Sequence, residues 1–186
     1  MFKEVKNMTK KYILTGGPGV GKSTIINLAQ NKALCSIEEA ATYIIKLELE
    51  KPENEQIVPW KNPYEFQRNV FSLQKKLEDE IPRGIEKALI DRGIIDNLAY
   101  LRLNNLQETE LYKEVEEEAR KRRYEKIFLL EPLPAIEKTE VRRDCDLAAK
   151  IHELIQEEYI KQGYKTEKIP ALPREERTEF ILKLIR

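Results

Sequence analysis

The sequence is poor in the residues on which several classes of functional site depend. Cys35 and Cys145 are its only two cysteines, and His152 is its only histidine. Two cysteines form neither a disulfide framework nor a four-cysteine zinc site, and they predict reduced thiols in a cytosolic protein. A Ser-His-Asp hydrolase would depend on His152, but no nucleophile-elbow motif accompanies it. We therefore interpret His152 as a surface or packing residue of a helix.

The sequence also lacks an excess of charge and a long apolar run. Its 33 basic residues balance its 33 acidic residues, so no overall field draws the chain to nucleic acid or anionic lipid. No apolar run approaches the length that spans a membrane, and residues 1–11 are charged rather than signal-like. We expect a cytoplasmic protein that binds neither nucleic acid nor membrane, and we leave its oligomeric state open.

Strand-like and helix-like segments alternate along the chain. Short apolar runs predict strands at 11–15, 34–37, 88–90 and 126–130, and a last short strand is expected at 166–169. Helical spacing predicts helices at 22–33, 38–50, 64–80, 95–104, 107–123, 147–162 and 174–185, and the charged segment 107–123 is expected on the outside. This alternation predicts an α/β fold with three layers, in which helices flank a parallel sheet of about five strands.

We expect one domain over residues 1–186, with two irregular segments of functional interest. Residues 51–63 carry three prolines and predict a long loop, which we expect on the side of a phosphate acceptor. Trp60 in this loop either stacks on a ligand ring or packs locally. The charged residues 135–146 predict a lid-like segment.

A glycine-rich loop follows the first predicted strand at once. Residues 16–23 read GGPGVGKS and match the pattern G-x-x-x-x-G-K-S/T. Such glycines let backbone N–H groups wrap a phosphate, and the next helix directs its positive end at the anion. Lys22 would reach the β- and γ-phosphates, Ser23 would ligate Mg²⁺, and Thr24 would contact the α-phosphate. The alternative is a glycine-rich turn without a ligand. The predicted triphosphate site comprises Gly16, Gly17, Pro18, Gly19, Val20, Gly21, Lys22, Ser23 and Thr24.

An aspartate ends the strand predicted at 88–90. A P-loop enzyme needs a carboxylate near its magnesium ion, and Asp91 is placed to supply it. Arg92 would grip a phosphate, and Gly93 would let the chain turn sharply. Alternatively, Asp91 only caps a helix and Arg92 is a surface charge. Asp96 is expected to face solvent or to cap the next helix.

Two glutamates, Glu38 and Glu39, follow the strand predicted at 34–37. In a parallel sheet this position lies at the same edge as the P-loop, where open α/β sheets bind ligands. One glutamate could accept a proton from a substrate hydroxyl, and Glu38 is our first choice. The alternative is that both only favour the start of a helix.

Seven segments in order resemble the small P-loop proteins related to nicotinamide riboside kinase, a family catalogued as an "AAA domain". They are GGPGVGKST, EEAATYI, FQRNVFSLQKKLE, DRGIIDNLAYL, KIFLLEPLP, RRDCDLAAKIHELIQEEYIKQGY and IPALPREERTEFIL. The resemblance covers residues 11–186 and implies the fold of nucleoside and nucleotide kinases. It also implies that Asp91 and Arg92 form the Asp-Arg pair of the third strand. Arg142 and Arg143 would be lid arginines over the transferred phosphate, although both could instead be exposed residues of a charged loop.

The resemblance also implies residues on the base side and the acceptor side. Ala171 and Pro173 lie in a stretch similar to the loop that brackets the nucleotide base, and Arg68 is similar to a substrate-side arginine. The chain departs from the family pattern at Thr42, where an arginine is expected. If that arginine holds an acceptor phosphate or carboxylate, this protein prefers a different acceptor.

Together these features predict a kinase that uses Mg²⁺ and ATP. Its acceptor would be a nucleoside, a nucleotide or a compound similar to nicotinamide riboside, in a cleft lined by Glu38, Arg68 and Arg92. ATP rather than GTP is implied by the resemblance, and GTP remains open. The alternative is a nucleotide-binding switch or slow ATPase or GTPase that acts on a protein or lipid partner. A kinase predicts a closed-in acceptor pocket beside the P-loop, whereas a switch predicts a shallow site.

Overall fold

The chain is built around one sheet of five parallel strands. The computed structural model describes residues 8–30, 34–133 and 147–185. Its strands are β1 (Lys10–Thr15), β2 (Cys35–Ile37), β3 (Lys87–Asp91), β4 (Lys126–Leu130) and β5 (Thr166–Ile169). They lie in the order β2-β3-β1-β4-β5, and every neighbouring pair is parallel. The loop after β1 therefore lies at the middle of the edge where all the strands end.

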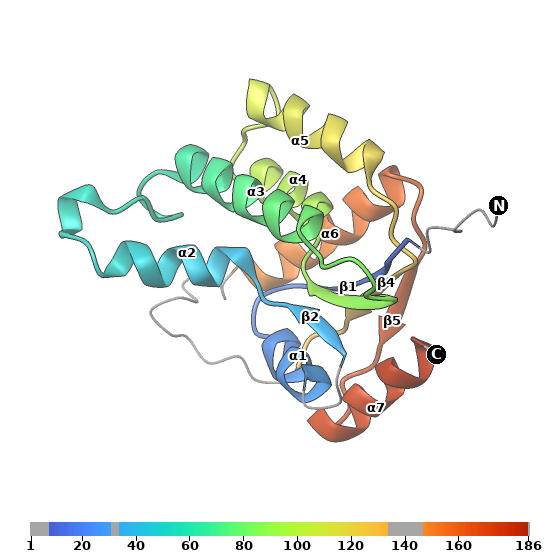
Figure 1. Ribbon diagram of the computed structural model, residues 1–186. Helices are drawn as coiled ribbons and strands as arrows, with labels where there is room; N and C mark the ends of the chain where they lie inside the picture. Colours follow the sequence, from blue (N-terminus) through green and yellow to red (C-terminus); the bar gives the residue numbers. More distant parts are fainter. Residues whose placement is uncertain (1–7, 31–33, 134–146, 186) are drawn as a thin grey trace.

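Helices cover both faces of this sheet (Figure 1). Helices α1 and α7 pack against each other on one face, and α4, α5 and α6 pack on the other. Helices α2 and α3 pair at one side of the sheet, and α3 also contacts α4. The predicted three-layer α/β fold is confirmed. The bounds are α1 (Lys22–Gln30), α2 (Ala40–Leu49), α3 (Pro63–Asp79), α4 (Ile94–Leu103), α5 (Glu110–Lys121), α6 (Ala148–Lys161) and α7 (Arg174–Leu184).

Alternate residues of the central strands fill the two cores on either side of the sheet. Ile13 of β1 packs with Ile90 and the residues of α4 and α6, whereas Leu14 packs with Phe128 and the residues of α1 and α7. Strands that are buried on both faces need apolar side chains at nearly every position. This requirement explains why short continuous apolar runs, rather than alternating ones, marked the strands in the sequence.

Helix α5 shows how a highly charged segment can still belong to the fold. Its buried residues are Leu111, Tyr112, Val115 and Ala119, whose spacing of three or four places them on one face. That face packs on α4, and the charged residues of α5 face outward. The predicted outer position of this segment is confirmed.

The segment predicted as a loop at 51–63 is more ordered than expected at its end. It contains one short 3-10 turn, η1 (Glu53–Glu55), and Pro63 is the first residue of α3 rather than the last of the loop. The Asn62 side chain caps α3 by accepting a hydrogen bond from the Glu65 amide at 3.2 Å. Proline fits the first helical position because its missing N–H is not needed there. The predicted lid segment 135–146 lies outside the described residues.

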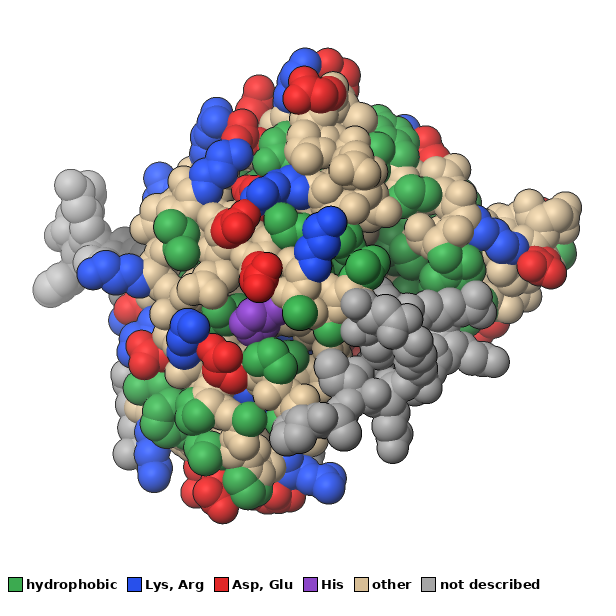
Figure 2. Space-filling view, turned by 180° about the vertical axis from the view of Figure 1, so that it is seen from behind, with side chains coloured by type: hydrophobic (Ala, Val, Ile, Leu, Met, Phe, Trp, Pro, Cys, Tyr) green, Lys and Arg blue, Asp and Glu red, His purple; other side chains and the backbone are tan. Residues whose placement is uncertain are grey.

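On one face of the molecule, side chains of both charges are mixed. Figure 2 shows blue and red side chains interleaved over the face opposite to that of Figure 1. Among the residues that the structure describes, no helix combines the length and the apolar character that crossing a membrane requires.

The two aromatic residues Phe128 and Phe180 test this packing as a matched pair. Phe128 is fully buried between the central strands and α1, whereas Phe180 on α7 is 37% exposed. We expect Phe128→Ala to lower the free energy of unfolding by about 3–5 kcal/mol, because it leaves a cavity in the core. Phe180→Ala should cost less than about 1 kcal/mol. Urea denaturation measures both values, and equal effects would contradict the assigned burial.

Candidate functional site

The loop between β1 and α1 has the backbone conformation of an anion cradle. Gly16, Gly19 and Gly21 have positive φ angles of 133°, 77° and 89°. At Gly16 a Cβ atom would also lie 2.8 Å from the Leu130 carbonyl oxygen of β4, so only glycine fits between the two strands. Helix α1 begins at Lys22 and carries no acidic residue in its first turn. Its positive end and the loop amides therefore converge on one place.

Lys22 lies folded back along this loop. Its Nζ atom donates to the carbonyl oxygens of Gly17 at 3.0 Å and Gly16 at 3.3 Å. Burial, and then the neighbouring charge of Arg92, lower the pKa of Lys22 to about 8. A phosphate in the cradle would offer this ammonium group a charged partner in place of neutral carbonyls. Ser23 and Thr24 are exposed in the first turn of α1, where their hydroxyls can reach a ligand.

Helix α6 packs directly against the P-loop through His152. The Gly17 amide donates to His152 Nδ1 at 3.4 Å, and a Cβ at Gly17 would lie 2.8 Å from the Ala148 carbonyl oxygen. An imidazole can accept this hydrogen bond only in its neutral form, and burial lowers the pKa of His152. His152 is therefore a packing residue as predicted, and it is the purple side chain in Figure 2.

In the turn after β3, the residue with the unusual backbone conformation is not the one predicted. Arg92, not Gly93, has the left-handed conformation, with φ of 65°, while Gly93 has φ of −103°. Gly93 is required for space instead, because a Cβ there would lie 2.9 Å from the hydroxyl oxygens of Tyr124 and Tyr159. The strained turn is held by a hydrogen bond of 2.9 Å from Gln74 Nε2 to the Arg92 carbonyl oxygen.

The guanidinium group of Arg92 connects the P-loop to the second strand. Its Nη1 atom donates to the Gly16 carbonyl oxygen at 3.0 Å and to Asp96 Oδ1 at 3.2 Å, and its Nε atom donates to Glu39. It also lies 5.2 Å from the ring centre of Tyr100. Burial disfavours the charged form, but the electrostatic effects of Tyr100 and then of the neighbouring carboxylates outweigh it and raise the pKa of Arg92 well above its usual value. Arg92 is therefore not a surface charge, and it lies beside the phosphate cradle.

Glu39, rather than Glu38, belongs to the site. Glu38 is exposed, whereas Glu39 pairs with Arg92 and accepts a hydrogen bond from Thr42 Oγ1 at 2.6 Å. Burial alone would raise the pKa of Glu39, but Arg92 and then Lys22 lower it to about 2. Glu38, our first choice, does not line the pocket that Glu39 lines, because neighbouring side chains in the last turn before α2 point to different sides.

Asp91 is buried at the end of β3 without a hydrogen-bond partner for its Oδ1 atom. Its side chain is 1% exposed, and burial and the negative charge of Glu39 raise its pKa to about 7. Asp91 is not a helix cap, because the cap of α4 is Gly93, whose N–H donates to Asp96 Oδ2 at 3.0 Å. Asp96 is a capping residue as predicted, but it is buried and does not face solvent.

Asp96 lies at the centre of further hydrogen bonds. It accepts from Thr15 Oγ1 at 2.5 Å and from the Tyr159 hydroxyl at 2.6 Å, in addition to Arg92 and Gly93. These partners come from β1, α6 and the turn after β3. Asp96 therefore fixes the orientation of Arg92 relative to the P-loop strand.

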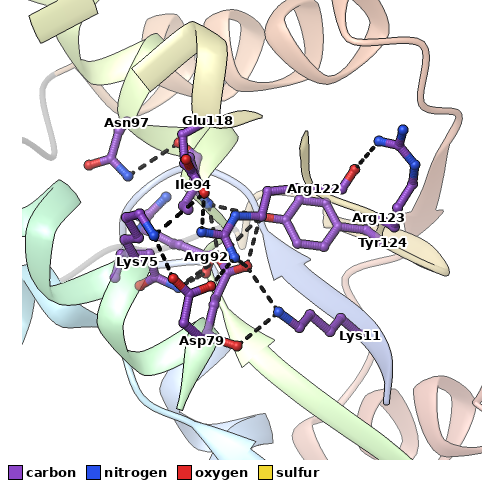
Figure 3. Close-up of polar contacts among 12 residues, drawn as sticks. Lys11, Lys75, Asp79, Arg92, Ile94, Asn97, Glu118, Arg122, Arg123 and Tyr124 are labelled. Atoms are coloured by element: carbon purple, nitrogen blue, oxygen red, sulfur yellow. Dashed lines mark hydrogen bonds and ion pairs between the residues drawn. The ribbon is translucent and has the colours of Figure 1, made fainter. Parts of the chain in front are cut away.

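A second buried carboxylate, Glu78 of α3, supports the same turn from behind. Glu78 Oε1 accepts from the Ile94 amide at 3.2 Å and from the Tyr124 hydroxyl at 3.1 Å. Lys11 Nζ and Arg122 Nη1 each lie 3.9 Å from Glu78 Oε2. Figure 3 shows Lys11, Arg122 and Tyr124 converging below Ile94. Burial raises the pKa of Glu78. This cluster was not anticipated from the sequence, because its members are spread from β1 to β4.

A pocket with a cavity volume of about 330 Å³ opens beside the P-loop. Ligand pockets in proteins commonly begin at about this size. The loop residues Pro59 and Trp60 contribute to its wall, so the segment 51–63 does border the pocket. Its apolar wall includes Ile45, Trp60, Phe66, Val70, Tyr100 and Leu103, and its polar groups include Lys22, Ser23, Glu39, Gln67, Arg92 and Asn97.

The structure places Arg68, the predicted substrate-side arginine, but it does not describe the two predicted lid arginines. Arg68 lies on α3, but its side chain is 58% exposed, pairs with Glu65 and does not line the pocket. The cause is helical spacing, since Phe66 and Val70 face inward and residue 68 faces the opposite way. Arg142 and Arg143 lie outside the described residues, and their proposed lid role stays a prediction.

An arginine that the sequence analysis missed joins the predicted base-side loop to the P-loop. Arg177 of α7 is 2% exposed and donates through Nη1 to the Val20 carbonyl oxygen at 2.8 Å. Its Nη2 atom donates to the carbonyl oxygens of Glu131 at 2.7 Å and Ile169 at 3.0 Å. Ala171 and Pro173 are exposed in the connection between Ile169 and α7. Arg177 shares a face with the buried Ile181, and this spacing was the available signal.

Comparison with protein families matches residues 11–177 to the family described as an AAA domain. The chain belongs to this family. No curated protein sequence matches the chain. Among solved structures, this AAA domain protein is similar to NadR in complex with NR, with a TM-score of 0.71 and 14% identity over 95% of this chain and 51% of that chain. It thus spans about half the length of the NadR chains that it matches.

Two complete kinases also have similar structures. A deoxyadenosine kinase from M. mycoides has a TM-score of 0.64 and 16% identity, over 94% of this chain and 97% of that chain. A thymidylate kinase from Ehrlichia chaffeensis has a TM-score of 0.65 and 11% identity, over 96% of this chain and 99% of that chain. At these identities the similarity shows the fold alone, which is a P-loop kinase fold.

The buried carboxyl group of Asp91 predicts a pH dependence of stability in the protein without magnesium or nucleotide. Its pKa is about 7 in the folded state against an ordinary value of 3.8. The folded state therefore binds more protons than the unfolded chain between about pH 4 and pH 7, and this residue makes stability fall as pH rises through that window. In Asp91→Asn, the fall in the free energy of unfolding over this pH range should be smaller by about 1 kcal/mol or more.

Urea denaturation of both proteins at several pH values between 4 and 8 measures this difference. Subtracting one curve from the other removes the contributions of the carboxylates that do not interact with Asp91. Parallel curves would contradict the assigned pKa of Asp91.

Proposed function

We propose that this chain is a kinase that transfers a phosphoryl group from Mg-ATP to a small molecule bound in the pocket beside the P-loop. One observation carries the proposal: Lys22 and Ser23 of the phosphate cradle line the same pocket as the Glu39–Arg92 pair and an apolar wall. A phosphate donor and an organic acceptor could therefore meet within one cavity. The kinase fold of the chain and of its structural neighbours supports the proposal.

The donor side is the P-loop, from Gly16 to Thr24. Its amides and the N-terminus of α1 would hold the β- and γ-phosphates, and the base would lie toward the connection that carries Ala171 and Pro173. Arg177 would keep this connection in register with the P-loop through the Val20 carbonyl oxygen. ATP is the donor that we propose, supported by a NadR structure that contains AMP-PNP.

The residues present fit a magnesium ion. Ser23 has an exposed hydroxyl that lines the pocket, and Asp91 has a buried oxygen without a partner that could hold a water of the magnesium shell. Within the described residues, no cluster of three histidine, cysteine or acidic side chains could hold a metal. This donor set suits Mg²⁺, which keeps several waters and takes ligands from the phosphates themselves. A bound Mg²⁺ would neutralise charge on the transferred phosphoryl group.

The protein side chains would contribute to catalysis by positioning the reactants and by stabilising charge. Lys22 and Arg92 would stabilise the negative charge of the phosphoryl group in transfer. Glu39 has a pKa of about 2, so it is ionised at neutral pH and would accept a hydrogen bond from the acceptor hydroxyl. Such orientation suits phosphoryl transfer, whose loose transition state needs little prior removal of the proton. A nucleotide switch needs only the donor side and leaves the adjoining pocket without a role.

The direct experiment is a transfer assay with Mg-ATP and a panel of hydroxyl compounds, compared with water alone. We expect ADP formation to be stimulated by an acceptor and a phosphorylated product to accumulate. Lys22→Ala should abolish this turnover, because the ammonium group would no longer hold the phosphates. Hydrolysis that no acceptor stimulates would count against a kinase and for a slow ATPase.

The neighbouring residues Glu39 and Glu38 give a matched pair of variants. Glu39→Gln should lower kcat by about 100-fold or more, because the acceptor hydroxyl loses a charged partner and Arg92 loses one of its two anions. Glu38→Gln removes the same charge one residue away on an exposed side chain, so its kcat should stay within about twofold of the original. Steady-state kinetics with the best acceptor measure both. Equal losses, or a larger loss in Glu38→Gln, would contradict the assignment.

A further inference from the structure

Two buried carboxamides from neighbouring helices line the pocket with oxygens that lack hydrogen-bond partners. Gln67 of α3 and Asn97 of α4 are each 4% exposed, and neither Gln67 Oε1 nor Asn97 Oδ1 has a partner. Asn97 Nδ2 donates to the Ile94 carbonyl oxygen at 3.2 Å, and Figure 3 shows its oxygen turned away from that contact. Buried carbonyl oxygens are nearly always paired in folded proteins, so two unpaired ones in one pocket indicate a ligand with N–H donors.

The surroundings of these carboxamides favour a flat ring. Trp60 and Phe66 contribute aromatic surface, and Ile45 and Val70 contribute aliphatic surface to the same pocket. Apolar walls with a few polar groups are typical of sites that orient a planar ligand by hydrogen bonds at its edge. Gln67 lies one helical position from Phe66, so the polar and apolar contacts come from the same turn of α3.

The charges of the pocket disfavour an acceptor that already carries a phosphate. Among the described residues that line it, the cations are Lys22 and Arg92 and the anions are Glu39 and Asp96. Arg92 is paired with both anions, and Lys22 belongs to the donor side. Thr42 also lines the pocket, but its hydroxyl is bonded to Glu39 and carries no positive charge. A second phosphate would therefore meet the carboxylate of Glu39 without a cation of its own.

Given the kinase function proposed above, we infer that the acceptor is a nucleoside-class compound without a phosphate. A flat ring with N–H donors, either a nucleobase or a nicotinamide, binds Gln67 and Asn97, and a sugar hydroxyl points toward Glu39. The hydroxyl oxygen forms the new bond to the γ-phosphorus, and the bond from that phosphorus to the bridging oxygen of ADP breaks. The hydroxyl proton leaves by way of Glu39 to solvent.

The first test compares each nucleoside with its own 5′-monophosphate as acceptor for Mg-ATP. The panel contains the common nucleosides and nicotinamide riboside, with simple sugars and polyols as further hydroxyl compounds. We expect at least one nucleoside to exceed its monophosphate by about 100-fold or more in kcat/KM, because a like-charge contact opposes the monophosphate. Preference for a monophosphate, or for a simple sugar, would overturn this acceptor class and leave a kinase standing. Transfer to no compound would overturn the kinase as well.

The second test assigns recognition to Gln67. Gln67→Leu should raise KM for the best nucleoside about ten- to a hundredfold, because the ring loses a buried hydrogen bond. Its kcat should stay within about threefold, because Gln67 is placed at the ring and not at the reacting hydroxyl. The control Gln107→Leu changes an exposed glutamine outside the pocket and should alter neither constant.

Folding and donor binding are checked separately in these variants by thermal melting and by titration with Mg-AMP-PNP, both of which should be unchanged in Gln67→Leu. Nucleoside titration in the presence of Mg-AMP-PNP then reports acceptor binding without turnover, and it should weaken in Gln67→Leu alone. An unchanged KM and an unchanged nucleoside affinity in Gln67→Leu would overturn the assigned recognition.

Discussion

The contacts of one buried guanidinium group set the geometry of the whole site. Arg92 binds the Gly16 carbonyl oxygen of the P-loop, Glu39 after β2 and Asp96 of α4. A buried cation is tolerated only when it is paired and hydrogen-bonded, so the three elements must meet at this point for the fold to be stable. The P-loop and the pocket beside it thus share a wall because of the same contacts. The left-handed backbone of Arg92 is a strain that Gln74 and the Glu78 cluster hold in place.

Two carboxyl groups near this arginine have pKa values shifted in opposite directions. Glu39 and Asp91 are both carboxylates near Lys22 and Arg92, yet the pKa of Glu39 falls to about 2 and that of Asp91 rises to about 7. The difference arises because Glu39 is bonded to Arg92 and Thr42, whereas Asp91 has a buried oxygen without a partner. Glu39, an ionised carboxylate beside the proposed acceptor, and Asp91, a carboxyl group with an unpaired oxygen near the proposed donor, would suit two different roles in phosphoryl transfer.

The fold and the P-loop were predictable from local sequence patterns. The apolar run at 126–130 coincides with β4, because a strand buried on both faces needs such a run. The short strand expected at 166–169 coincides with β5, which lies at the edge of the sheet. The cradle follows from glycines whose conformation no other residue adopts easily. The choice between Glu38 and Glu39 was not predictable, since it depends on which side of one turn meets Arg92. The same holds for Arg68, whose outward direction is set by how α3 packs, and for Arg177, whose partners lie far away in the chain.

We propose that the phosphate cradle and the acceptor pocket form one continuous site, with the transferred phosphoryl group between Lys22 and Arg92. A crystal structure with Mg²⁺ and AMP-PNP would locate the γ-phosphate. We expect it at the mouth of the pocket, with Lys22 moved from the carbonyl oxygens of Gly16 and Gly17 to bind it and with Glu39 still beside it. A γ-phosphate walled off from the pocket, or a triphosphate bound elsewhere on the protein, would rule out a continuous site.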